Sequence, residues 1–247
     1  MKFDVDIKEL KLSTSTEEKV LLKDICFNLG ENCIYTILGK NGCGKTTLIK
    51  SLAGLLDKRF YIINGKILAD NIDICSAGES ELLNIRKNKI KYVFQDAVNS
   101  FDPLRKSGYY FERFGLDKDE SENLLSYFLL PQLNEIGIMY PYELSGGMAQ
   151  RLSFVISLLM KPELLILDEP TSGIDPAIAN LFLLKIKEFV SGNKKTVLLV
   201  TQDIEFAKST SGFIAHIDSG TLSNFKPNKE YFGSEEILFK KSVRSNE

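Results

Sequence analysis

Apolar and polar residues alternate through much of the first third of the chain. Residues 3–12 alternate clearly, and residues 20–29 alternate more loosely. A period of two is typical of strands with one buried face. The segment 61–68 is interrupted by Asn64-Gly65, a dipeptide typical of a hairpin turn. The pattern therefore predicts antiparallel strands here, with a turn at Asn64-Gly65.

The rest of the chain shows a second pattern, in which apolar runs alternate with helical periodicity. The apolar runs cover residues 34–38, 90–94, 164–167, 197–200 and 213–217. The helical patterns cover residues 46–55, 147–160 and 177–190. Apolar runs without alternation are typical of strands buried on both faces. Strands that alternate with helices predict an α/β fold with a parallel sheet covered on both sides.

Residues 96–145 interrupt this alternation. Residues 121–130 have a helical pattern, and Pro103, Pro131 and Pro141 divide the remainder. Because proline ends or kinks helices, the segment is expected to hold several short elements. We predict a mainly helical insertion.

A glycine-rich segment follows the first apolar run. Residues 39–46 fit the pattern G-x-x-x-x-G-K-[ST] between a predicted strand and a predicted helix. Backbone N–H groups of such a loop and the helix N-terminus bind phosphate. We expect Lys45 to reach the β- and γ-phosphates of a nucleotide and Thr46 to bind Mg²⁺. The expected nucleotide-binding residues are Gly39, Lys40, Asn41, Gly42, Cys43, Gly44, Lys45, Thr46 and Thr47.

Two carboxylates end the buried run at 164–167. Ligands bind at the carboxyl ends of strands in doubly wound sheets, so Asp168 is expected beside Lys45 and Thr46. Asp168 is then a candidate Mg²⁺ ligand and Glu169 a candidate general base. A solvated turn is the alternative for two acidic residues after a strand, but the phosphate loop favours the catalytic interpretation.

A third motif precedes the helix predicted at 147–160. Ser145 is a preferred N-cap residue, and Gly146 and Gly147 leave the helix N-terminus bare of side chains. Such a terminus suits a phosphate group. An ordinary helix start is the alternative for this motif taken alone.

Taken together, the three motifs resemble the nucleotide-binding domain of ABC transporters. The resemblance rests on Walker A at 39–46, Walker B at 164–169 and the signature Leu144-Ser145-Gly146-Gly147-Met148, in the family's order and spacing. It implies a RecA-like P-loop NTPase core with an N-terminal antiparallel β subdomain and an inserted α-helical subdomain. We expect one domain over residues 1–247, with a core of 1–95 and 154–247 and a helical subdomain of 96–153 that carries the signature.

The resemblance also implies functional roles. ATP and Mg²⁺ are the expected cofactors, in a head-to-tail dimer where one subunit's Walker motifs and the other's signature enclose each ATP. Gln95 corresponds to the Q-loop residue that contacts Mg²⁺ and water, and Asp175 to the D-loop across the dimer. Residues 94–103 and 140–151 are similar to ATPases of dipeptide, oligopeptide and nickel importers. Expected partners are a second, different ATPase subunit, two transmembrane permease subunits and an extracellular solute-binding protein, at the cytoplasmic face of the membrane.

One position departs from the family pattern at a catalytic site. Gln202 stands where the family has a histidine that contacts the γ-phosphate, and an amide never carries a positive charge. Because positioned acid-base groups contribute about 10²- to 10⁴-fold in rate, we expect a slowed site in an asymmetric heterodimer. The single histidine, His216, is expected in a sheet, as a core or sheet-face residue. The family's adenine-stacking aromatic is also missing near Thr14.

Composition excludes several other classes of protein. The 31 Lys and Arg nearly balance the 33 Asp and Glu, which gives no electrostatic footprint for nucleic acid. The four cysteines form no C-x-x-C pair, so free thiols are expected. Two alternatives to an importer ATPase stay open: a structural ATP-binding partner that hydrolyses little, and a soluble ABC ATPase outside transport. The second lacks support, because no sustained heptads occur and there is a single cassette.

Overall fold

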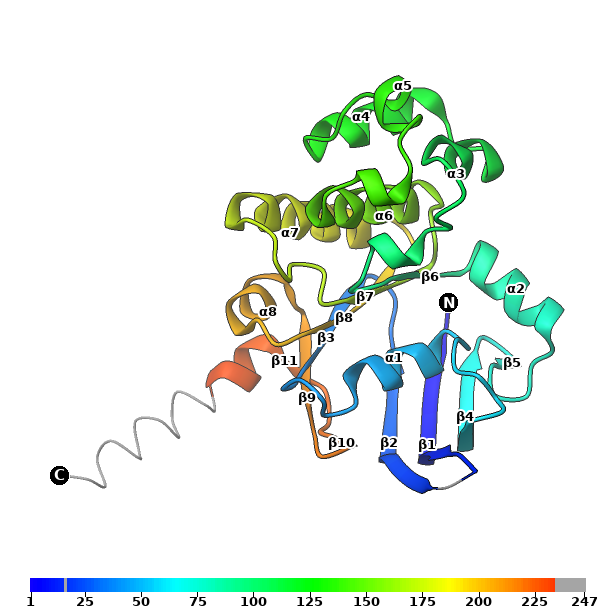
Figure 1. The fold of residues 1–247 in the computed structure, drawn as a ribbon. Helices are drawn as coiled ribbons and strands as arrows, with labels where there is room; N and C mark the ends of the chain where they lie inside the picture. Colours follow the sequence, from blue (N-terminus) through cyan, green and yellow to red (C-terminus); the bar gives the residue numbers. More distant parts are fainter. Residues whose placement is uncertain (16, 234–247) are drawn as a thin grey trace.

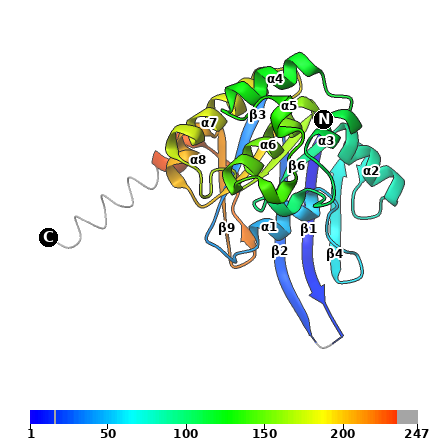
Figure 2. The same ribbon diagram turned by 45° about the horizontal axis from the view of Figure 1, so that its top comes forward.

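The computed structural model describes residues 1–15 and 17–233. The first third of the chain forms a four-stranded antiparallel sheet in the order β2-β1-β4-β5. Its strands are β1 (Phe3–Ser13), β2 (Glu18–Leu29), β4 (Tyr61–Ala69) and β5 (Ile72–Asp73). Figure 2 shows β1 and β2 extending away from the helices as a long ribbon. The prediction of antiparallel strands in this region is confirmed.

The predicted hairpin turn at Asn64-Gly65 is wrong, because β4 continues through both residues. The pairing with β1 shifts from Ile7 opposite Gly65 to Glu9 opposite Asn64, so β1 carries one extra residue here. A Cβ on Gly65, where φ is +146°, would lie 2.2 Å from the carbonyl oxygen of Asp6. The glycine therefore permits close approach of two strands at a β-bulge, rather than a reversal of the chain.

We predict that Gly65→Ala destabilises the protein by about 3 kcal/mol or more, because the added Cβ meets backbone and the φ angle is unfavourable. Gly115→Ala is the matched control, since φ there is +61° and an added Cβ would meet no atom within 4 Å. The control should cost only about 1 kcal/mol. Chemical denaturation of both variants measures the difference, and equal losses would contradict the close approach.

The larger sheet has the order β10-β9-β3-β8-β7-β6. Its parallel strands are β3 (Cys33–Leu38), β6 (Ile90–Val93), β7 (Leu164–Asp168), β8 (Thr196–Thr201) and β9 (Phe213–Asp218). The short strands β10 (Thr221–Leu222) and β11 (Lys226–Pro227) pair antiparallel to β9. The five predicted buried runs are thus confirmed as parallel strands, and their carboxyl ends meet at one edge of the sheet.

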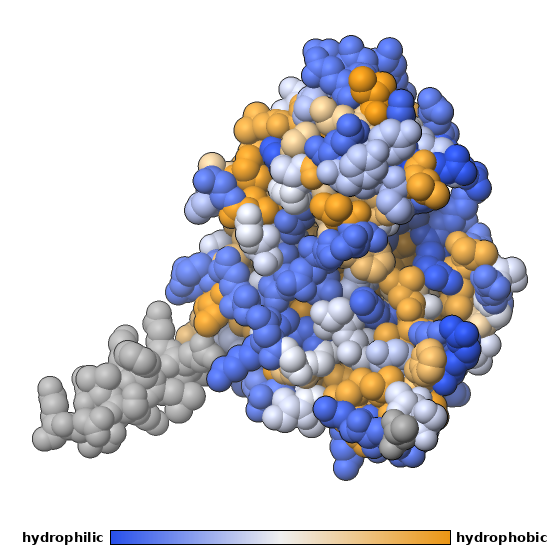
Figure 3. All heavy atoms as spheres, in the orientation of Figure 1, coloured by the Kyte–Doolittle hydropathy of each residue, from blue (hydrophilic) through white to orange (hydrophobic). Residues whose placement is uncertain are grey.

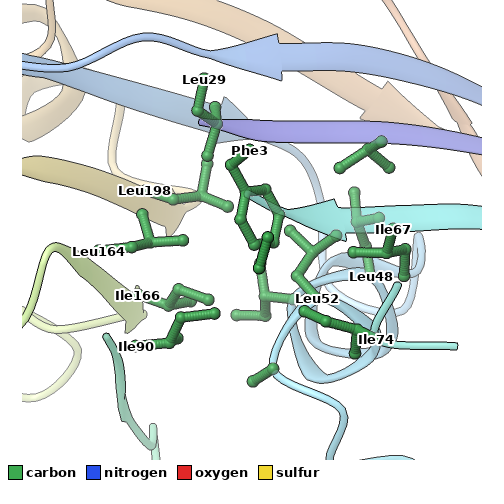
Figure 4. Close-up of a cluster of buried hydrophobic side chains, with 14 of the residues drawn as sticks. Phe3, Leu29, Leu48, Leu52, Ile67, Ile74, Ile90, Leu164, Ile166 and Leu198 are labelled. Atoms are coloured by element: carbon green, nitrogen blue, oxygen red, sulfur yellow. The ribbon is translucent and has the colours of Figure 1, made fainter. Parts of the chain in front are cut away.

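Helices cover both faces of this sheet. On one face, α1 (Lys45–Leu52) packs with the antiparallel sheet, and Figure 4 shows Phe3, Leu52, Ile166 and Leu198 together in that core. On the other face lie α6 (Gly146–Leu159) and α7 (Pro176–Ser191). Two helices connect strands, α2 (Glu79–Asn88) before β6 and α8 (Ile204–Thr210) after β8. The predicted two-sided covering is confirmed.

Short helices gather at the end of the molecule opposite β1, β2 and β4 (Figure 1). They are α3 (Gly108–Arg113), α4 (Lys118–Tyr127) and α5 (Leu133–Ile136), and the same segment of the chain contains the short helices η1 (Val98–Ser100) and η2 (Pro141–Glu143). Phe128, Phe154 and Phe182 bind this group to α6 and α7 through ring contacts of 4.6 to 5.5 Å. The region is helical as predicted, whereas the domain division at 95 and 153 stays a prediction. Residues 234–247 of the proposed core lie outside the described residues.

Candidate functional site

The glycine-rich loop forms one wall of a cavity of about 550 Å³. Gly44, with φ of +107°, is the N-cap of α1, so backbone in the left-handed region leads directly into the helix. Glycine adopts that region at little cost, which explains the residue type. The loop, β6 and β7 contribute Asn41, Gly42, Cys43, Gly44, Lys45, Thr46, Thr47, Gln95 and Glu169 to the lining. The structure therefore brings together most of the residues expected to bind and cleave a nucleotide.

Lys45 is buried at the base of this cavity. Its Nζ donates hydrogen bonds to the carbonyl oxygens of Gly39 (2.8 Å) and Lys40 (3.0 Å). The same Nζ lies 3.3 Å from Oε1 of Glu169, and both side chains are less than 10% exposed. A buried ammonium group at the N-terminus of α1 is suited to a polyphosphate.

Asp168 lies beside the loop, as the sequence predicts. Oγ1 of Thr46 donates to Oδ1 of Asp168 at 3.4 Å, and the phenol of Tyr92 on β6 donates to Oδ2 at 2.7 Å. Burial raises the pKa of the Asp168 carboxyl, although both hydrogen bonds oppose that shift. Burial also raises the pKa of Tyr92, as does the nearby Asp168, so the phenol remains a donor. The hydroxyl and carboxylate oxygens match the hard oxygen ligands that Mg²⁺ prefers.

Glu169 follows β7 in a strained backbone conformation, with φ of +48°. Its N–H donates to the carbonyl oxygen of Val200 at 2.9 Å. Its Oε2 accepts from the hydroxyl of Thr201 at 3.0 Å and from the backbone N–H of Gln202 at 3.2 Å. Left-handed backbone at a non-glycine residue costs about 1–3 kcal/mol and often marks a functional site. The surroundings of Glu169 hold it in this unfavourable conformation.

Gln150 on α6 supports the same turn. Its side chain is buried, and Nε2 donates to the carbonyl oxygens of Glu169 (3.3 Å) and Pro170 (2.8 Å). The residue lies one turn beyond Ser145, whose side chain caps α6 by accepting from the N–H of Met148 at 3.2 Å. The signature helix is therefore tied directly to the turn that carries the candidate base.

The signature residues lie away from the cavity of their own chain. Leu144 is buried, whereas Ser145 and Gly146 are exposed. None of the described residues in the signature 144–148 lines the cavity. Asp175 caps α7 by accepting from the N–H of Ala177 at 2.8 Å. Ser145, Gly146 and Asp175 are exposed, so another molecule can reach them.

Gln202 follows β8 and lies next to the glycine-rich loop. Its side chain is exposed and lines a neighbouring hollow of about 640 Å³ together with Gly39, Lys40 and His216. His216 lies on β9 as an exposed sheet residue, and its ring is 6.5 Å from that of Tyr231. Of the two positions expected for His216, the structure thus supports the sheet face.

Another part of the cavity wall comes from β2 and from the turn after β9. Lys19, Val20 and Leu21 form it, with Ser219 and Gly220. The hydroxyl of Thr14 instead bonds the carbonyl oxygen of Glu17 at 3.1 Å. Val20 and Leu21 therefore contribute aliphatic side chains to this wall.

Three residues with direct contacts at the site are not identified by sequence motifs: Tyr92, Gln150 and Thr201. Tyr92 lies two residues before the end of the apolar run 90–94, and β6 pairs with β7. Its position near the carboxyl end of a predicted strand was therefore a signal that it could lie close to Asp168. Thr201 ends the β8 run in the same way. Gln150 lies within the segment 140–151 that is similar to importer ATPases, but its contact with Glu169 and Pro170 depends on how α6 packs against the turn after β7.

Three further features concern the described residues. No helix between residues 1 and 233 is long and apolar enough to cross a membrane. In the same part of the chain, no cluster of three or more His, Cys, Asp or Glu residues could enclose a metal ion. The four cysteines are free, as expected.

The comparisons with known proteins agree with this geometry. The model of the ABC transporter family matches residues 22–172. The chain is 28% identical to the dipeptide transport ATP-binding protein DppD of Bacillus subtilis, over 85% of this chain and 66% of that protein. It is 31% identical to DppD of Caldanaerobacter subterraneus, over 84% of this chain and 67% of that protein.

A solved structure of an ABC transporter subunit is also similar to this chain. CbiO1 of Clostridium perfringens, part of the ABC transporter complex cbiONQ, is 26% identical with a TM-score of 0.73, and the match covers 98% of this chain and 94% of that chain. The predicted P-loop α/β fold is confirmed by this likeness. The chain belongs to the ABC transporter family, as an ATP-binding domain.

Proposed function

We propose that this chain is the Mg²⁺-dependent ATPase subunit of an ABC importer for a small solute, such as a peptide, nickel or a metal chelate. The observation that carries the proposal is that Lys45, Thr46 and Glu169 line one cavity at the carboxyl ends of β3 and β7, where Thr46 is hydrogen-bonded to Asp168. The dipeptide transporters among its relatives favour peptides as the solute.

Each residue of the cluster has a role that fits its surroundings. Lys45 and the loop N–H groups would hold the β- and γ-phosphates, while Thr46 and Asp168 would hold Mg²⁺, with Gln95 at the edge of the cavity. When bound, Mg²⁺ would neutralise part of the negative charge of the phosphates. Glu169 would accept the proton of the attacking water through Oε1, since Oε2 is already bonded to β8.

A head-to-tail dimer would complete the site. The exposed Ser145 and Gly146 lie outside this chain's cavity, so they can contact a nucleotide only on another subunit. Their helix N-terminus then offers N–H groups to the second phosphate face, together with Leu144, Gly147 and Met148 of the signature. Asp175, exposed at the start of α7, would lie across the same dimer.

Permease subunits would dock on the helical region at the cytoplasmic face of the membrane, and an extracellular binding protein would deliver the solute. Apolar side chains are exposed there, and Figure 3 shows hydrophobic groups between hydrophilic ones at this end of the molecule. The exposed residues include Leu104, Leu129, Ile138 and Tyr142. Such residues commonly form the anchors of protein interfaces.

We further propose that the second ATPase subunit is a different chain that carries out most of the hydrolysis. Gln202 supplies no positive charge at the γ-phosphate, and its exposed side chain lines the neighbouring hollow. The same observation favours one alternative function, a structural ATP-binding partner that hydrolyses little.

Isolation of the chain with its membrane partners tests the proposed function. We expect two permeases and a second ATP-binding subunit to accompany it, and ATP-driven uptake of peptide by vesicles that contain the complex. Recovery of the chain without any permease would contradict the transport function and favour a non-transport ATPase.

A further inference from the structure

The two carboxylate oxygens of Glu169 have different partners. Oε2 accepts two hydrogen bonds from the end of β8, from the Thr201 hydroxyl and the Gln202 backbone N–H. Oε1 is buried and, among the described residues, accepts no hydrogen bond; it lies 3.3 Å from Nζ of Lys45. Oε1 therefore has an ion-pair partner but no hydrogen bond that fixes its position, and a buried oxygen of this kind calls for an explanation. The unbonded oxygen belongs to a residue that lines the phosphate cavity.

The Thr201 hydroxyl has a defined direction. The side chain is fully buried, and Oγ1 accepts from the backbone N–H of Asp203 at 3.0 Å. Because that bond occupies a lone pair, the single hydroxyl hydrogen is available for Oε2 of Glu169. Asp203 in turn caps α8 by accepting from the N–H of Phe206 at 2.9 Å, which fixes the turn after β8. Strand, turn and helix cap therefore orient the hydroxyl toward the carboxylate.

We propose that Thr201 is a positioning residue for the hydrolytic reaction, which sets the rotation of the Glu169 carboxylate so that Oε1 faces the attacking water. This inference rests on the proposed function, in which Glu169 is the general base. Thr201 does not contact the nucleotide; it acts through Glu169.

The two hydrogen bonds to Oε2 of Glu169 do not depend on the side chain at position 202. The two donors are a threonine hydroxyl and a backbone N–H, and neither changes with the residue type at 202. The base thus keeps its orientation although glutamine replaces the family's histidine. This arrangement explains how the site can remain competent, although Gln202 contributes no charge at the γ-phosphate.

Single-turnover ATP hydrolysis by the assembled complex tests the proposal, with the partner's own Walker site inactivated. Thr201→Val keeps the shape but removes the donor, and it should lower the hydrolysis rate about 10- to 100-fold, the range for a hydrogen bond to a charged group. The affinity for Mg²⁺-ATP should stay within about twofold, since Thr201 touches no phosphate-binding group. Thr201→Ser restores the donor and should restore most of the rate.

Thr210→Val is the matched control, because Thr210 is also buried on the adjoining helix and its hydroxyl has no hydrogen-bond partner among the described residues. Its rate should equal that of the wild type. Thr201→Ala provides a second variant without the hydroxyl if valine prevents folding. Thermal unfolding of each variant identifies losses caused by misfolding.

Three results distinguish the positioning role of Thr201 from the proposed ATPase function. A slow Thr201→Val enzyme with normal affinity, rescued by serine, supports the positioning role. An unchanged rate in Thr201→Val, or a serine variant as slow as the valine variant, would overturn it while leaving the ATPase function intact. Absence of hydrolysis in the wild-type site would instead contradict the proposed function.

Discussion

Lys45→Met is expected to lower the affinity for Mg²⁺-ATP by about 100-fold or more. The lysine is the buried cation of the cavity, and charged hydrogen bonds to phosphate contribute about 1.5–3 kcal/mol each. Methionine retains the length of the side chain without the charge. Equilibrium binding of a fluorescent ATP analogue measures the loss directly.

The Lys45→Met experiment must distinguish weaker nucleotide binding from a loss of folding stability. Removal of Lys45 leaves Glu169 as a buried, unpaired carboxylate, which costs about 3–5 kcal/mol. The comparison should therefore also be made in a Glu169→Gln background, where no charge is left unpaired. Lys66→Met is the control, since Lys66 is an exposed lysine of β4 that does not line the cavity. Equal losses at both lysines would contradict a specific phosphate contact by Lys45.

Glu169→Gln is expected to slow hydrolysis at this chain's own site by about 10²- to 10⁴-fold, the usual contribution of a general base. Nucleotide binding should be retained, because the amide has nearly the same shape and can still bond β8. Trapping of the dimer with bound ATP, followed by single-turnover analysis, measures both quantities.

Glu205→Gln supplies the control for this change. Glu205 is an exposed carboxylate in the first turn of α8, in the segment that follows Thr201 and Gln202. Its removal should leave the rate unchanged. A normal rate in Glu169→Gln would show that another group, or none, accepts the proton.

Much of this fold follows from local patterns of the sequence. The strands β3, β7 and β8 are apolar at nearly every position, so their burial and parallel arrangement could be predicted. The motifs around Lys45 and Asp168 could also be placed together, because carboxyl ends of parallel strands share one edge. Asn64-Gly65 was misinterpreted because a close approach between strands and a tight turn both select glycine.

The remaining part of the site depends on contacts between distant segments. The hydrogen bond from Tyr92 to Asp168 joins residues 76 positions apart, and that from Thr201 to Glu169 joins residues 32 positions apart. Such contacts depend on the register of neighbouring strands and on side-chain rotamers, which a motif does not specify. The orientation of the Gln202 side chain also depends on the turn after β8: the side chain lines the neighbouring hollow, and its role at the γ-phosphate stays a prediction.

The central claim is that this chain's own Walker site hydrolyses ATP with Glu169 as its base, although glutamine occupies position 202. The most direct measurement is single-turnover hydrolysis by the assembled complex in which the partner's equivalent glutamate has been changed to glutamine. We predict slow but measurable hydrolysis, which disappears when Glu169→Gln is added in this chain. A residual rate that is the same with and without the Glu169 change would contradict the claim.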